Sequence, residues 1–200
     1  MRRLLFLPLF LLLNFTSYGQ SDAILDVMKE SDEKKEAYWD ARRDAWRNPD
    51  AGVHADSIVP PEVFRGYWIY PSTMRAINVS RAALWDDLSI GLEQTVILVS
   101  ADMKKETMVE EFRSINEELK EQGFETWIDM SGTNFAALQV SEAEGEIRHF
   151  VGLGMYNDQF MIIDYEGKMT PEQLMELRNM SMEDTMDGLF NENVLSLFGL

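Results

Sequence analysis

The chain contains two imidazole groups, His54 and His149, that could take part in acid–base chemistry. His54 lies in a segment rich in proline and polar residues, and His149 alternates with Ile147 and Val151 in a stretch typical of a β-strand. A serine hydrolase places a histidine beside a nucleophilic serine and an acid, but no serine here lies in a Gly-x-Ser-x-Gly motif. We interpret His149 as a packed strand residue, and the sequence assigns no catalytic residue.

Carboxylates are the second group of side chains with chemical potential. Asp129 and Asp164 each accompany an apolar run, and two converging carboxylates could act as general acid and base or hold a metal. The clusters at Asp86–Asp87 and at 183–192 lack the alternating spacing and fixed glycine of a calcium loop. The sequence therefore predicts no metal site and no cofactor, and an acid- or metal-dependent hydrolase remains the alternative function.

Aromatic side chains supply a first candidate binding surface in the charged segment Lys29–Arg47. Tyr38, Trp39 and Trp46 are the only large apolar groups of that segment. Arg42 lies four residues from both Tyr38 and Trp46, a helical spacing that lets a guanidinium cover an aromatic face. The segment is either a partner-binding helix or a helix that lays one aromatic edge on its own domain.

A second aromatic run contains Tyr67, Trp68 and Tyr70 and is followed by Pro71. Such a run could form a platform for carbohydrate or peptide. A proline at its end is also typical of an edge strand whose aromatic side chains seal a sheet. We expect the edge strand and keep the three aromatic residues as a candidate partner surface.

Two tripeptides predict covalent modification. Asp56-Ser57-Ile58 and Asp184-Thr185-Met186 are similar to the acidic–hydroxyl–aliphatic tripeptide that Bacteroidetes glycosylate on exported proteins. Both lie in polar stretches, so Ser57 and Thr185 are candidate O-glycosylation sites.

The N-terminus predicts export. Arg2 and Arg3 precede the apolar run Leu4–Leu13, and small residues follow, an order typical of a secretory signal peptide with cleavage between Gly19 and Gln20. The apolar run is well short of the roughly twenty residues that span a bilayer, so we expect no stable membrane insertion after cleavage. The protein is expected in the periplasm, with the cell surface and secretion left open. Because the chain contains no cysteine, it has no lipoprotein anchor and no disulfide.

The composition is strongly acidic, with a formal net charge of −17, and removal of the signal makes it two units more negative. Such a surface repels phosphate backbones, so nucleic acid is excluded as a partner. An envelope protein is the expected partner, and the oligomeric state stays open.

Capping residues and hydrophobic periodicity define the expected elements. Thr95–Val99 is a β-branched run typical of a strand buried on both faces. Thr107 begins a helix of capping-box type that ends at Gly123, and Thr170 begins another. Further expected elements are strands at 74–79, 124–130, 135–140, 147–155 and 160–165, the last four as an antiparallel meander, and a helix at 81–88.

These elements predict an α+β fold: a mostly antiparallel sheet of about five to six strands with two to three helices on one face, plus an N-terminal charged helix. The expected organisation is a signal peptide at 1–19, the charged helix at 20–47, a linker at 48–62, the α+β domain at 63–180 and a tail at 181–200 that docks on the domain.

Four runs carry a resemblance to a known family: Ile77–Ala82, Leu92–Ser100, Gly123–Glu125 and Phe160–Met169. They resemble the domain of unknown function 4252 family, small exported proteins of Bacteroidetes-type bacteria, over roughly residues 63–180. Many members look like lipoproteins, a property that this cysteine-free chain does not share. The resemblance implies an envelope-signalling context and brings no catalytic residues. The leading hypothesis is a non-enzymatic binding module of the cell envelope.

Overall fold

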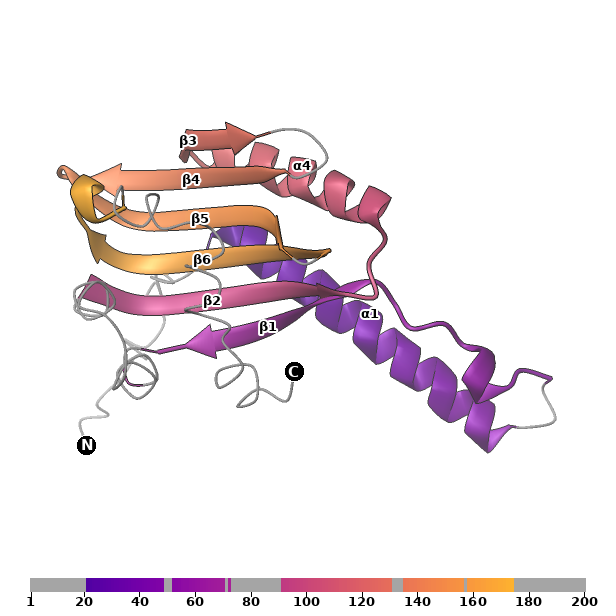
Figure 1. Cartoon of the computed structure of the whole chain (residues 1–200). Coiled ribbons are helices and arrows are strands. Elements are labelled where there is room, and N and C mark those ends of the chain that lie inside the picture. Colours follow the sequence, from indigo (N-terminus) through magenta and orange to yellow (C-terminus); the bar gives the residue numbers. More distant parts are fainter. Residues whose placement is uncertain are drawn as a thin grey trace, which may run out of the picture.

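The fold is α+β and is built on one open, antiparallel, six-stranded sheet (Figure 1). The computed structural model describes residues 21–48, 52–70, 72, 91–130, 135–156 and 158–174. The strands are β1 (Val63–Ile69), β2 (Leu92–Ala101), β3 (Glu125–Met130), β4 (Ala136–Ala143), β5 (Glu146–Tyr156) and β6 (Gln159–Met169). Their order across the sheet is β1-β2-β6-β5-β4-β3.

The strand pairing confirms the predicted meander, because β3, β4, β5 and β6 are successive antiparallel neighbours. β6 also pairs with β2, which places the expected Thr95–Val99 strand inside the sheet. Val96, Ile97, Leu98 and Val99 are all buried, as a β-branched run with both faces covered requires. Among the described strands, β1 is the expected edge strand, and β2 is its only neighbour there.

Two long helices, α1 (Asp22–Arg47) and α4 (Lys105–Glu121), lie on the same face of the sheet (Figure 1). Ser21 caps α1, since its Oγ accepts a hydrogen bond from the Ile24 N–H at 3.3 Å. No described helix is both long and apolar enough to cross a membrane.

The start of α4 corrects the sequence prediction. The helix begins at Lys105 with Lys104 as its N-cap, so Thr107 lies in the first turn and does not cap it. Asp102, at φ 56°, turns the chain sharply at the end of β2, which starts the helix earlier than the capping pattern indicates. A hydrogen bond from the Thr107 side chain instead keeps the pKa of Glu62 below its usual range. The predicted end at Gly123, with φ 89°, is confirmed.

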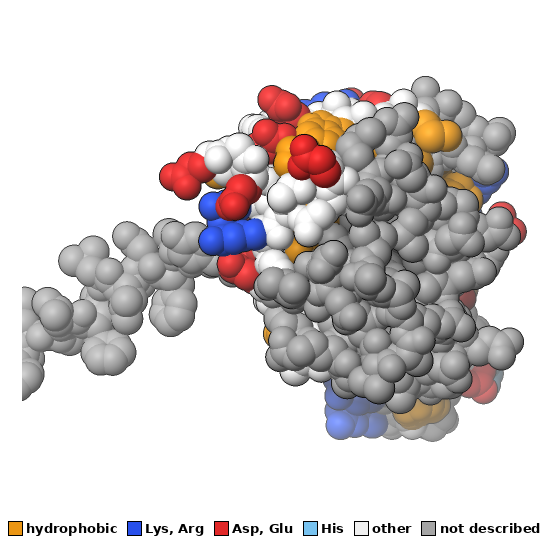
Figure 2. Space-filling view, turned by 60° about the vertical axis from the view of Figure 1, so that its left-hand side comes forward, with side chains coloured by type: hydrophobic (Ala, Val, Ile, Leu, Met, Phe, Trp, Pro, Cys, Tyr) orange, Lys and Arg blue, Asp and Glu red, His pale blue; other side chains and the backbone are white. Residues whose placement is uncertain are grey.

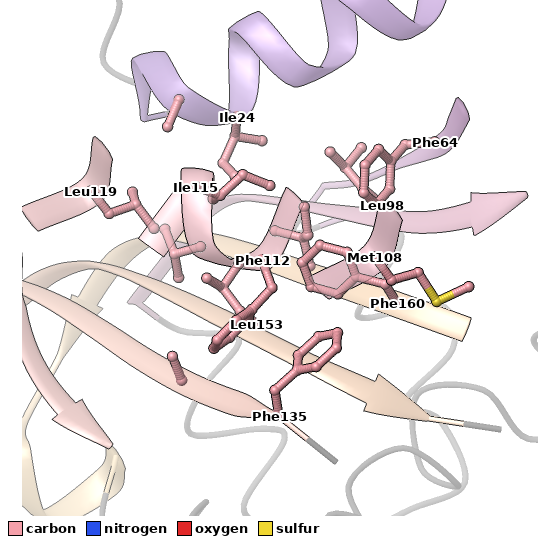
Figure 3. Close-up of a cluster of buried hydrophobic side chains, with 14 of the residues drawn as sticks. Ile24, Phe64, Leu98, Met108, Phe112, Ile115, Leu119, Phe135, Leu153 and Phe160 are labelled. Atoms are coloured by element: carbon pink, nitrogen blue, oxygen red, sulfur yellow. The ribbon is translucent and has the colours of Figure 1, made fainter. Parts of the chain in front are cut away.

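The main core lies between the two long helices and the sheet (Figure 3). Ile24 points from α1 toward Ile115 of α4, and Phe112 and Phe160 lie below them. The core residues that Figure 3 labels are Ile24, Phe64, Leu98, Met108, Phe112, Ile115, Leu119, Phe135, Leu153 and Phe160. The start of α1 is therefore part of the core of the sheet domain.

A second core lies on the opposite face of the sheet and includes Ile97, Phe150 and Tyr165. Leu174 joins this second core, so the helical turn that begins at Pro171 packs on the face opposite α1 and α4. The predicted capping pattern is present there, because the Thr170 and Gln173 side chains each bond to the other's backbone N–H. Of the predicted domain helices that the structure describes, α4 therefore lies on one face, together with the N-terminal α1, and the turn at Pro171 lies on the other.

In its described residues, 48 and 52–62, the predicted linker contains one short element, the 3₁₀ helix η3 (Ala55–Ser57), with Ala55 buried. Several predictions fall outside the described residues: the signal peptide with Gly19 and Gln20, the 74–79 strand, the 81–88 helix, the tail at 181–200 and Thr185.

Candidate functional site

The distal half of α1 extends away from the sheet (Figure 1). The buried residues of α1 are Ala23, Ile24 and Ser31, all in its first ten positions. Beyond Ser31 the helix contacts η3, whose segment folds back beside it. We call residues 35–47 and 52–59 the arm. The arm is attached to the domain but shares little of its core, so most of its surface is free of sheet contacts.

The arm holds the first predicted aromatic group around Arg42. The guanidinium carbon lies 5.6 Å from the Tyr38 ring centroid, 5.7 Å from that of Trp39 and 5.2 Å from that of Trp46. These distances are within the range of cation–π attraction. The four-residue spacing predicted the contacts with Tyr38 and Trp46, and Trp39 is added by the structure. Tyr38 and Trp39 also meet edge to face, at 5.2 Å between centroids.

Hydrogen bonds fix the Arg42 side chain in this position. Nη1 donates to the Tyr38 hydroxyl at 2.8 Å, and Nη2 donates to Asp56 Oδ1 at 3.3 Å. The second bond joins the helix to η3, because Asp56 belongs to that element. Nε is buried without an acceptor. Arg42 therefore orients the aromatic side chains and ties the two halves of the arm together.

Large apolar groups remain exposed on the arm. Trp39 is 51% exposed and Trp46 is 59% exposed, and Val53 and Val59 are exposed nearby in the sequence. Tryptophan held in one orientation loses little conformational freedom on binding, and it is enriched among the residues that contribute most to protein interfaces. The arm therefore has the composition and rigidity of a binding surface.

The second predicted aromatic group does not form a single platform. Neighbouring residues of a strand point to opposite faces, and Tyr67 packs on the second core whereas Trp68 is exposed. Tyr70 is exposed beyond the end of β1.

Trp68 also lies away from the arm. The Phe64 N–H bonds to Ser31 Oγ, and Gly66, two residues on, lies beside Met28. From Phe64 to Trp68, β1 therefore runs toward the N-terminal end of α1. The arm lies at the other end of α1, so the structure does not bring the two aromatic groups together.

His149, on β5, is hydrogen-bonded to the buried Asp164 of β6. The His149 Nε2 atom bonds to Asp164 Oδ1, and the second carboxylate oxygen, Oδ2, accepts the Ser21 N–H at 3.3 Å. Asp164 is only 2% exposed, and the His149 side chain is 17% exposed. The His149 ring meets Phe124 edge to face, at 5.0 Å between centroids. This arrangement fixes the start of α1 on the sheet.

The carboxylates named for the alternative function are not brought together. Asp129 lies on β3, where it pairs with Lys120 at 3.6 Å, and Asp164 lies on β6, three strands away. The described part of the chain has no group of three metal-binding side chains. The contacts found for His149 are a hydrogen bond with Asp164 and an edge-to-face contact with Phe124. The geometry therefore indicates a structural role for His149 and Asp164, which is to anchor the start of α1 on the sheet.

One structural role was missed in the sequence. Asp164 interrupts the apolar run Phe160–Ile163 of a strand that is buried on both faces. A charged side chain buried in such a strand needs a hydrogen-bonding partner. This requirement could have indicated from the sequence that Asp164 has a structural role. The modification candidate Ser57 is exposed on η3, where its hydroxyl donates to the His54 carbonyl at 2.7 Å.

The surface is acidic in the part of the chain that the structure describes. Figure 2 shows several acidic side chains on one face, beside smaller hydrophobic and basic areas. Burial, followed by repulsion from Glu30, raises the pKa of Glu111 where α4 faces α1. A pocket there of about 10 Å³ has room for about one water molecule, so it offers no space for a larger ligand.

Comparisons with protein-family models, with curated proteins and with solved structures found no match to this chain. The resemblance to the domain of unknown function 4252 family therefore stays a prediction.

Proposed function

We propose that the protein is an exported envelope protein that acts as a non-enzymatic binding module and engages a partner protein through the arm. The observation that carries this proposal is the pair of exposed tryptophans, Trp39 and Trp46, on a helix end that extends beyond the sheet. Arg42 holds both rings from one side, so their exposed sides face outward in a fixed orientation.

The chemistry of the arm favours a protein over nucleic acid. Basic and acidic groups alternate along the helix there, with Arg43 paired to Asp40, so no basic stripe is present to follow a phosphate backbone. Tryptophan, tyrosine and arginine together are typical of the central residues of protein interfaces. A partner with an apolar pocket rimmed by polar groups fits this surface.

The test is crosslinking and pull-down of the tagged protein from the envelope of its own host, with mass spectrometry of bait and partners. Trp39→Ala/Trp46→Ala is expected to lose the partner that the wild-type chain captures. Trp68→Ala is the matched control, because it removes an exposed tryptophan from the sheet domain instead. Loss of the partner with Trp68→Ala and retention with the double variant would refute the arm as the binding surface.

The mass of the bait tests export in the same experiment. Cleavage before Gln20 predicts a polypeptide that begins at that residue. An added mass equal to that of a sugar chain on the peptide that contains Ser57 would identify glycosylation there. An uncleaved chain recovered from the cytoplasm would refute export.

A further inference from the structure

The arm is electrically balanced, although the protein as a whole is strongly acidic. The whole chain has a formal net charge of −17. The arm contains equal numbers of basic and acidic side chains, which are Lys35, Arg42, Arg43 and Arg47, and Glu36, Asp40, Asp44 and Asp56. Two copies of an acidic protein repel each other through their net charge, and this repulsion is smallest where the surface is locally balanced. The arm can therefore meet a second copy with little local repulsion.

The exposed tryptophans of the arm lie beside a row of charges with a definite order. Trp39 and Trp46 are seven residues apart, about two helical turns, so they lie on the same side of α1. Exposed charged residues run along the helix next to them at spacings of three and four residues, in the order Glu36, Asp40, Arg43 and Arg47. The two acidic residues are nearer the sheet, and the two basic residues are nearer the tip of the arm.

This order makes the arm complementary to itself in one orientation. When two arms lie antiparallel with Trp39 of each opposite Trp46 of the other, the acidic half of each row faces the basic half of the other row. Glu36 of one copy then lies close to the level of Arg47 of the other. A parallel pairing places like charges together, and flanking charges of this kind determine the orientation of paired helices.

We infer that the arm binds a second copy of this chain, with the two arms antiparallel and Trp39 of each opposite Trp46 of the other. This inference rests on the proposed function, because it names the partner that the arm engages. Both copies contribute the same surface, so the pair has a two-fold axis and forms a closed dimer. Arg42 already holds both rings in place, which reduces the conformational freedom lost on pairing.

The length of the arm keeps the acidic domains of the two copies apart (Figure 1). Ser31 is the last buried residue of α1, and at about 1.5 Å per residue the midpoint between Trp39 and Trp46 is about 17 Å farther along the helix. In the antiparallel pair the two Ser31 positions are therefore about 35 Å apart along the helix axes. Charges are screened over about 8 Å at physiological ionic strength, so this separation weakens the repulsion between the domains.

The exposed area of the tryptophans indicates a reversible dimer. Trp39 is 51% and Trp46 is 59% exposed. A fully covered aromatic side chain buries about 150–250 Å², so the four tryptophans of a dimer supply roughly 300–550 Å². Standard interfaces bury about 1,200–2,000 Å² in total, and weak ones bury less. The neighbouring charged side chains supply the remaining contacts, and we expect a dissociation constant on the order of 1–100 μM.

The test is analytical ultracentrifugation of the purified, exported protein over a range of concentrations. The wild-type protein is expected to pass from monomer to dimer as its concentration rises. Trp39→Ala/Trp46→Ala should weaken the dimer by at least about tenfold, and the control Trp68→Ala should dimerise like wild type. A wild-type protein that stays monomeric well above the expected dissociation constant, or a dimer that is unchanged in the double variant, would overturn the proposal.

Charge-reversal variants test whether the row of charges pairs the two arms. Glu36→Arg/Asp40→Arg makes the row wholly basic, and Arg43→Glu/Arg47→Glu makes it wholly acidic, so each variant alone should be mainly monomeric. An equimolar mixture of the two should form a heterodimer, because each row then faces opposite charges along its whole length. If the mixture associates no better than either variant alone, the pairing of the arms is refuted.

The same measurements separate this inference from the proposed function. Purified wild-type protein contains no other partner, so its oligomeric state reports on the second copy alone. If it stays monomeric while Trp39 and Trp46 are still needed to capture a different envelope protein, the proposed function stands and the second copy is refuted as the partner of the arm.

Discussion

A buried hydrogen-bonded pair, Gln139 of β4 and Asn116 of α4, connects the sheet to the helix inside the main core. Gln139 is 0% exposed, and its Nε2 donates to Asn116 Oδ1. Thr126 Oγ1 on the edge strand donates to Gln139 Oε1 at 3.0 Å. Replacing Asn116 with leucine removes the acceptor and leaves a buried amide donor without a partner.

The expected magnitude follows from that unpaired donor. A buried polar group left unsatisfied costs about 1–3 kcal/mol, so Asn116→Leu should lower the free energy of unfolding by about 2 kcal/mol. In a chain of this size that corresponds to a decrease in Tm of about 4–8 °C. Replacing both partners with apolar residues removes the unpaired donor as well, so Asn116→Leu/Gln139→Met should be about 1–2 kcal/mol more stable than the sum of the single changes predicts.

The assay is urea unfolding of the four proteins of this cycle at pH 7, followed by circular dichroism. Thr126→Val is the control, because Thr126 is exposed and water can replace its hydrogen bond, so a loss below about 1 kcal/mol is expected. If the two single changes simply add in the double variant, the reasoning that Gln139 depends on Asn116 is refuted.

Four further predictions concern single residues. Phe160→Ala should destabilise by about 3–5 kcal/mol, because Phe160 is fully buried among aromatic rings; a loss below about 1 kcal/mol in urea unfolding would contradict its place in the core. Gly123→Ala should cost about 1–2 kcal/mol through the left-handed backbone alone, since an added Cβ meets nothing within 4 Å; the same Tm as wild type would argue against this end of α4. Thr170→Val should cost about 1 kcal/mol by removing a helix cap, measured by thermal unfolding with Thr170→Ser as the control. Burial, and then repulsion from Glu30, raises the pKa of Glu111 in the folded state. Glu111 therefore contributes stability below its unfolded-state pKa, and this contribution is lost as the pH rises through the folded-state pKa. The variant Glu111→Gln should accordingly have a higher Tm than wild type at pH 7 and a similar Tm at pH 4.

The parts of the fold that local sequence determines were predictable. The α4 apolar residues recur at three and four positions, so the helix and its end at Gly123 follow from periodicity and a glycine cap. The four-strand meander follows from alternating runs separated by turn residues such as Glu144 and Gly145, both at positive φ.

Features that depend on contacts between distant segments were not predictable. Nothing local in the sequence indicates that β6 inserts between β2 and β5, because strand pairing depends on the whole sheet. The same limit applies to the candidate site. Helical spacing predicts that Arg42 contacts Tyr38 and Trp46. The contact between Asp164 and Ser21 joins residues far apart in the chain, so no local pattern predicts it. The separation of Tyr67 and Trp68 onto opposite faces follows from strand alternation once β1 is known.

The position of β6 also constrains when the sheet can assemble. β6 is the last described strand in sequence, yet it lies in the interior of the sheet, between a β1–β2 ribbon and the β3–β5 meander. During synthesis these two parts have no shared strand until β6 has been made, so the sheet cannot close on a nascent chain that stops short of it. Folding dominated by such distant pairings is intrinsically slow. A chain whose sheet stays open until β6 has been made can still be threaded through a translocation channel, and its strand edges stay exposed to chaperones for the same interval.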